Sequence, residues 1–213
     1  MKLNALLLTV SLGLAATPGA WAYPDSTLYD NLGNTTLTEA MYETDTWGAS
    51  QFTTDGHNYI LNTVALLLYR TGDTTAQLDI YSNSGDVPGT SLGTLTPPES
   101  IPLNTAEKVT FTASGISLSA NSTYWVVLHA PTGQLWWSYT DDSTGTGSGF
   151  STINTFSVNA GTKWATPIDY YPNQMQVNAT LAAVPEPSQW AMMGVTALGV
   201  TGYALRRRLV KTN

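Results

Sequence analysis

Short apolar and β-branched runs alternate with turn-forming residues along the middle of the chain. The clearest run, residues 59–70, is apolar on both faces around Val64–Leu68 and predicts a central strand covered on both sides. In residues 76–82, Leu78 and Ile80 alternate with polar neighbours, so one face is expected to be buried and the other solvated. Further strands are expected at residues 91–96, 109–113, 116–119, 123–130, 134–140 and 175–181.

Turn signals separate these runs. Pro88-Gly89 suits the two central positions of a type II turn. The sequence Pro131-Thr132-Gly133 predicts a hairpin that joins the two strands on either side of it. Residues 38–46 are expected to form a short turn of helix, and residues 141–149 a polar loop. This organisation predicts an all-β fold, an antiparallel β-sandwich of jelly-roll-like form.

The N-terminal segment has the three-part pattern of a secretory signal peptide. Lys2 precedes an apolar core at residues 5–16, and Ala20 and Ala22 place small residues at the −3 and −1 positions of a cleavage site. We therefore expect residues 1–22 to form a signal-peptide helix, handled by the export translocon and removed by signal peptidase. The alternative is a buried N-terminal helix.

The C-terminal segment combines a proline break, an uncharged run and a basic tail. Residues 190–205 carry no charge and would reach about 24 Å as a helix. That length is a marginal single transmembrane helix for a hydrocarbon core of about 30 Å. The basic tail at residues 206–211 predicts a cytoplasmic C-terminus, and its charges are Arg206, Arg207, Arg208 and Lys211. The alternative to a transmembrane helix at residues 190–205 is an amphipathic core helix.

Residues 185–213 resemble a PEP-CTERM sorting signal, because Pro185, Glu186 and Pro187 match its motif and a short span and arginine cluster follow. The resemblance implies an exosortase as partner, a transient anchor in the inner membrane, and delivery to the cell surface or the extracellular polysaccharide matrix. A permanent single-span anchor is the alternative.

The remaining body, residues 23–184, has the length of one domain with one core. It holds three basic and fourteen acidic residues, so its net charge is −11 against −7 for the whole chain. A surface this acidic repels phosphate backbones, and we expect no nucleic-acid binding. The chain has no cysteine, which excludes disulfides and thiolate metal sites.

The order of segments in the body resembles a choice-of-anchor domain, most closely the type named R. The resemblance rests on LYDNL at residues 28–32 and WGASQFTTDGHNYILNTVALLL at residues 47–68, and it continues through LDIYSNSGDVPGTSLGTL and ISLSANSTYWVVL to the closing MQV. Such domains carry one of several alternative surface anchors, PEP-CTERM among them. The resemblance implies no enzymatic activity and no catalytic residues. We expect no cofactor other than the structural calcium ion considered below.

Tryptophans are the candidate ligand-binding residues. Adjacent Trp136 and Trp137 must point to opposite faces of a strand, so one is expected in the core and one outside. An exposed face that includes Trp136, Trp137 or Trp164 would suit stacking on sugar rings of an exopolysaccharide. The alternative is that all these rings serve the core.

Two further sites need three-dimensional support. Asp141 and Asp142 open a loop rich in oxygen atoms that would suit a structural calcium ion, although the loop lacks the alternating acids of an EF-hand. Residues 89–93 read G-x-S-x-G, but a nucleophile elbow needs a helix after the serine, and His129 is the only histidine downstream.

We therefore expect an exported, non-enzymatic protein of the cell surface or extracellular matrix that serves adhesion or matrix building. A carbohydrate-binding module is the alternative, and a secreted hydrolase ranks below both.

Overall fold

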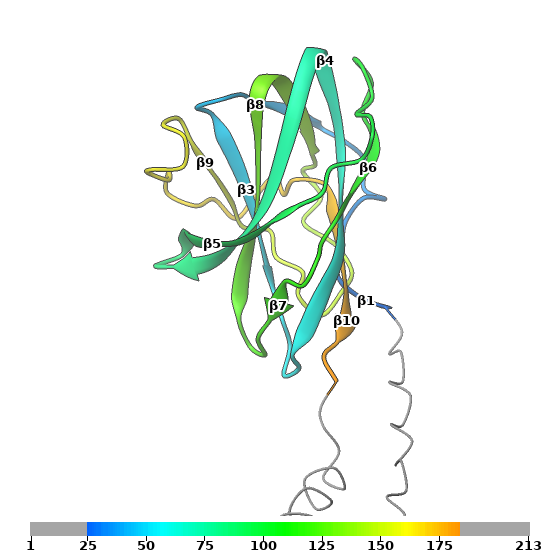
Figure 1. Cartoon of the computed structure of the whole chain (residues 1–213), viewed down its shortest axis with the longest axis vertical. Helices are drawn as coiled ribbons and strands as arrows, with labels where there is room; N and C mark the ends of the chain where they lie inside the picture. The colour runs from blue at the N-terminus through cyan, green and yellow to red at the C-terminus, as the bar shows by residue number, and fades with distance from the viewer. Residues whose placement is uncertain (1–24, 184–213) are drawn as a thin grey trace, which may run out of the picture.

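A computed structural model describes residues 25–183, and the expected signal peptide and sorting signal lie outside this range (Figure 1). The described part is all-β, as predicted. No helix long and apolar enough to cross a bilayer occurs within residues 25–183. The strands are β1 (Asp25–Asp30), β2 (Thr38–Tyr42), β3 (Trp47–Thr53), β4 (Tyr59–Ser84), β5 (Val87–Leu95), β6 (Glu107–Thr112), β7 (Ser117–Leu118), β8 (Thr123–Tyr139), β9 (Asn154–Ser157) and β10 (Met175–Leu181).

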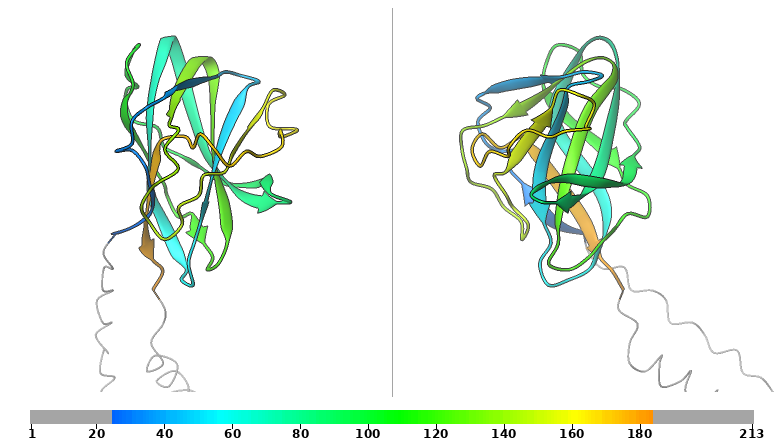
Figure 2. Two further views of the ribbon diagram at one scale, coloured as in Figure 1. Left: turned by 180° about the vertical axis from the view of Figure 1, so that it is seen from behind. Right: turned by 90° about the vertical axis from the view of Figure 1, so that its left-hand side faces the viewer.

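The strands form one antiparallel sheet with the order β1-β10-β4-β8-β3-β9, and it curls around its own core (Figures 1 and 2). The first half of β4 pairs with β10, β6 and β7, and its second half pairs with β5 and β8. In the same way β8 pairs with β3 near its start and with β2 near its end. The two long strands therefore belong to both halves of the sheet and bring the halves together.

The predicted hairpin through Pro131-Thr132-Gly133 is wrong, because β8 continues through these residues. They form a bend that lies against an irregular stretch of β4, where the register shifts on both sides of the Thr75–Thr132 pair. Gly133 has φ 73°, and a Cβ there would lie 2.6 Å from the Asp73 carbonyl oxygen. Long-range pairing with β4 has overridden the local turn signal, and glycine serves the close approach of the two strands.

Two other local predictions are corrected. The turn after β4 is formed by Gly85 and Asp86, whose φ angles of 58° and 65° suit a type I′ hairpin, whereas Pro88 and Gly89 lie within β5. The expected helical turn at residues 38–46 is replaced by β2, which pairs with the end of β8. In both places pairing with a neighbouring strand decides the conformation.

The main core lies inside the curl of the sheet. Leu78 and Ile80 are buried there, as the alternation predicts, and Val64 and Leu66 are covered on the first half of β4. The expected solvated face of residues 76–82 is wrong at Asp79, which is 2% exposed. The Asp79 carboxylate accepts hydrogen bonds from the side chains of Gln77 and Thr94, which compensate its burial. A second apolar cluster covers the outer face of β3 and β8.

Candidate functional site

Trp136 and Trp137 point to opposite faces of β8, as predicted. Trp137 is fully buried, donates a 2.9 Å hydrogen bond to the Gln174 carbonyl oxygen, and contacts the Tyr42 ring edge-on. Trp136 is half-buried on the other face, where its ring lies parallel to that of Tyr69 with the ring centroids 5.9 Å apart. Trp137 is therefore a core residue, and Trp136 alone of the pair reaches the surface.

Trp164 lies elsewhere. It is half-buried and packs against the second apolar cluster, which is built on Ala49, Trp125 and Val127. The three tryptophans that the sequence singled out therefore do not converge on one surface. The structure instead brings together tyrosines from three separate segments.

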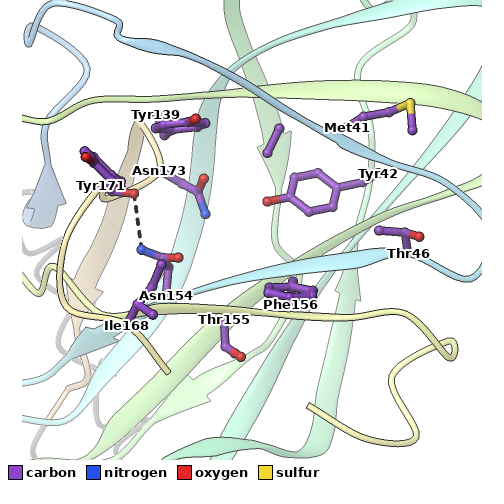
Figure 3. Close-up of a pocket in the computed structure, with 11 residues that line it drawn as sticks. Met41, Tyr42, Thr46, Tyr139, Asn154, Thr155, Phe156, Ile168, Tyr171 and Asn173 are labelled. Atoms are coloured by element: carbon purple, nitrogen blue, oxygen red, sulfur yellow. Dashed lines mark hydrogen bonds between the residues drawn. The ribbon is translucent and has the colours of Figure 1, made fainter. Parts of the chain in front are cut away.

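A surface pocket of about 280 Å³ lies between β2, β9, the end of β8 and the segment 168–173 (Figure 3). Tyr42 points into its middle, with Phe156 on one side and Tyr139 and Tyr171 at the end (Figure 3). Phe156 and Tyr171 are 49% and 43% exposed. The pocket is lined by Ala40, Met41, Tyr42, Thr46, Tyr139, Asn154, Thr155, Phe156, Ile168, Tyr171 and Asn173.

The position of Tyr42 depends on a glycine in the neighbouring strand. A Cβ at Gly48 would lie 2.7 Å from the Tyr42 hydroxyl oxygen and closer still to two ring carbons. On its other side the Tyr42 ring meets Trp137, with centroids 6.3 Å apart. The ring is thus held between β3 and the core, and its hydroxyl is left toward the pocket.

Three tyrosine rings cluster at the rim of the pocket, and the side-chain amide of Asn154 holds the segment that carries two of them. The Tyr171 ring lies 5.9 Å from that of Tyr139 and 4.9 Å from that of Tyr170. Asn154 Nδ2 donates to the carbonyl oxygens of Tyr170 and Tyr171 at 3.1 and 3.2 Å. Tyr171 has φ 58°, a conformation that costs a bulky residue about 1–3 kcal/mol and that often marks a functional position.

The polar groups of the pocket are neutral. Asn173 Nδ2 donates a 2.9 Å hydrogen bond to Ser50 Oγ in the buried floor. Burial raises the pKa of Tyr42 far above its usual range, and a hydrogen bond with Asn173 only partly opposes this effect. The Tyr42 hydroxyl therefore stays protonated over the whole physiological range and can donate or accept a hydrogen bond.

Asp141 and Asp142 lie in an exposed loop, as expected. Asp142 Oδ1 accepts hydrogen bonds from the Thr144 amide at 2.9 Å and the Thr144 hydroxyl at 2.7 Å, and these bonds lower the Asp142 pKa. No group of three or more histidine, cysteine or acidic side chains suited to a metal ion is found within residues 25–183. The Asp142 carboxylate thus bonds to its own loop.

Ser91 of the G-x-S-x-G string lies in β5, with no helix after it, and no hydrogen bond within residues 25–183 joins it to His129. His129 is buried on the outer face of β8 and stacks on Trp47 with ring centroids 4.0 Å apart. Neither of its ring nitrogens has a hydrogen-bond partner among residues 25–183, and Nε2 lies 4.0 Å from an Asp79 carboxylate oxygen. Burial lowers the His129 pKa, although Asp79 opposes the shift.

No family model matches the chain, and no curated protein matches it in sequence. We take the pocket lined by Tyr42, Tyr139 and Tyr171, the tyrosine pocket, as the candidate site because exposed aromatic rings and uncharged polar groups gather around it. The sequence did not predict it as a site. The one signal for it was the adjacent pair Tyr170-Tyr171, because two aromatic residues in a polar, proline-flanked segment are hard to bury together.

Proposed function

We propose that this chain is an exported, non-enzymatic protein of the cell surface or extracellular matrix, and that its jelly-roll-like β-sandwich binds carbohydrate in the tyrosine pocket. The observation that carries the binding proposal is the combination of exposed aromatic rings with uncharged amides and hydroxyls around one pocket. Aromatic faces stack on the apolar faces of sugar rings, while neutral polar groups bond to sugar hydroxyls.

The distribution of exposed rings supports this site. Phe156, Tyr170 and Tyr171 belong to the few large apolar side chains that are well exposed within residues 25–183, and all three lie at or beside the pocket. Exposed aromatic groups that gather in one place usually mark a binding surface, because a folded domain gains by burying them. The strained backbone of Tyr171 agrees with selection for a ligand contact rather than for stability.

The arrangement of the two ends supports an anchored protein. Asp25 of β1 pairs with Thr180 of β10, so the described chain begins and finishes at one side of the domain (Figure 1). In all three views β9, which lines the pocket, lies away from these ends (Figures 1 and 2). A domain tethered at residue 183 would therefore hold its pocket away from the tether.

In this proposal signal peptidase cuts after Ala22, and an exosortase recognises the motif Pro185-Glu186-Pro187 with its span and arginine tail. The intact mass of the protein from cells with and without the exosortase tests this half of the proposal. A mass that ends near residue 184–187, found outside the cell only with the enzyme, is expected. A full tail in the inner membrane in both cases would contradict it.

Binding is tested with the full chain in a detergent that has no sugar head group, so that the micelle does not compete. Co-sedimentation with a panel of insoluble and soluble polysaccharides is measured for the natural chain and for Phe156→Ala. We expect a loss of affinity of about tenfold or more, equal to about 1.4 kcal/mol. The matched control is Leu92→Ala, because Leu92 is a similarly exposed apolar residue on β5 and does not line the pocket. Equal binding by both variants would contradict the proposed site.

A further inference from the structure

We infer that the tyrosine pocket selects a neutral sugar residue and rejects its uronic acid counterpart. This inference rests on the proposed carbohydrate binding and names the chemical class of its ligand. It follows from the charges in and around the pocket, from its polar groups and from its size.

The pocket contains no charged side chain. None of its eleven lining residues is aspartate, glutamate, lysine, arginine or histidine. Two of the three basic residues of the described part are engaged elsewhere: Arg70 donates to the Ile101 carbonyl oxygen and Lys108 to Gln176 Oε1. The third, Lys163, does not line the pocket, so no cation of the lining is available to pair with a bound carboxylate.

The surroundings of the pocket are acidic. Glu43 and Asp45 flank the lining residues Tyr42 and Thr46 in the chain, and Asp169 follows Ile168. The described residues as a whole carry a net charge of −11. An anionic ligand would approach against this field, which acts over about 8 Å at physiological ionic strength.

A bound carboxylate would also lose water without compensation. Moving a charged group from water into an uncharged pocket is unfavourable unless a cation or several donors replace the hydration shell. Asn154 Nδ2 is already engaged by two carbonyl oxygens and Asn173 Nδ2 by Ser50. Few donors remain for an anion, whereas sugar hydroxyls both donate and accept and can use the amide and hydroxyl oxygens as well.

The volume limits the size of the ligand. At about 280 Å³ the pocket is slightly smaller than the range of roughly 300–1,000 Å³ that small-molecule sites occupy. It therefore suits a short stretch of a chain or its terminal residue rather than a long oligosaccharide laid along a groove.

The test compares matched ligands that differ only at carbon 6. Oligosaccharides of glucose, galactose and mannose are paired with the corresponding glucuronate, galacturonate and mannuronate, and binding to the full chain is measured at low and at physiological salt. For at least one pair we expect the neutral member to bind at least tenfold more tightly than the uronate. We also expect raised salt to narrow the difference, because salt screens the repulsion.

A further variant tests whether the lack of a cation in the pocket causes the selectivity for neutral sugars. Thr46→Lys adds a cation at the pocket wall, at a side chain that makes no hydrogen bond within residues 25–183. We expect the ratio of uronate affinity to neutral-sugar affinity to rise at least threefold. Thr105→Lys, on a different part of the surface, is the matched control, because it changes the net charge equally.

The outcomes separate the two proposals. Binding of uronates as tight as that of the neutral sugars, lost in Phe156→Ala, would overturn the neutral selectivity and leave carbohydrate binding in place. Absence of binding to every sugar would overturn the proposed function itself. Equal gains in uronate binding from the lysine at position 46 and the control lysine would show that net charge alone acts, and would overturn the role of the pocket.

Discussion

Substitution of Gly48 by alanine tests the construction of the pocket. Gly48 lies inside β3, and its three nearest neighbours beyond the adjacent residues are all atoms of Tyr42. A methyl group there would come within 2.7 Å of the Tyr42 hydroxyl oxygen and still closer to the ring, so the ring must move. Gly48 has no positive φ, so alanine meets no backbone strain.

Two opposing effects set the change in the free energy of unfolding that Gly48→Ala causes. Replacing a glycine within a strand by alanine stabilises by roughly 0.5–1 kcal/mol, because the unfolded chain loses freedom. Overpacking a filled site costs typically about 1–3 kcal/mol. We therefore expect Gly48→Ala to lower the free energy of unfolding by about 1–2 kcal/mol, which lowers the melting temperature by about 2–8 °C. Carbohydrate binding should weaken with it.

A double-mutant cycle isolates the cause. In a Tyr42→Ala chain the atoms that clash are gone, so the added methyl should become neutral or stabilising by up to about 1 kcal/mol. Chemical unfolding of the four chains measures both effects. Gly56→Ala is the control, since a Cβ there meets nothing within 4 Å. If Gly48→Ala destabilised the chain equally with and without the Tyr42 ring, the proposed packing would be refuted.

Two further predictions concern buried side chains. Trp137→Ala should lower the free energy of unfolding by about 3–5 kcal/mol, because it leaves a cavity in the main core. Trp136→Ala should lower it by about 1–2 kcal/mol, because the Trp136 ring is only half-buried. Equal losses of stability in urea unfolding would contradict the assignment of the two rings to opposite faces. Because burial lowers the His129 pKa, the neutral ring should stabilise the fold above its ordinary pKa of about 6.5, and this stability should be lost as the pH falls through the lowered value. His129→Gln should reduce the change in unfolding free energy between pH 7 and pH 5, and an unchanged pH dependence would refute this reasoning.

Much of the fold could be predicted from local patterns. Residues 175–181 were expected as a strand and form β10, because apolar and polar residues alternate there in the sequence and are buried alternately in the structure. The opposite orientation of Trp136 and Trp137 follows from the period of two in any strand. Local signals failed at Pro131-Thr132-Gly133 and at residues 38–46, where pairing with a distant strand was stronger than the turn or helix preference.

The candidate site could not be predicted in the same way. Its walls come from β2, the end of β8, β9 and the segment 168–173, which are up to about 130 residues apart in the chain. Single residues in these segments look like ordinary core or loop positions. Whether these residues form a pocket depends on which strands the curled sheet places side by side.

By itself the sequence determined the class of fold, the positions of most strands, the acidic charge of the body and the absence of thiol chemistry, because each depends on composition or on near neighbours. The tertiary structure alone decided that β4 and β8 run unbroken through both halves of the sheet, that Asp79 and Trp137 are buried, and that Tyr42, Tyr139 and Tyr171 meet around one pocket. Those outcomes arise from long-range hydrogen bonding and packing between strands, whose free energy no short stretch of the chain contains.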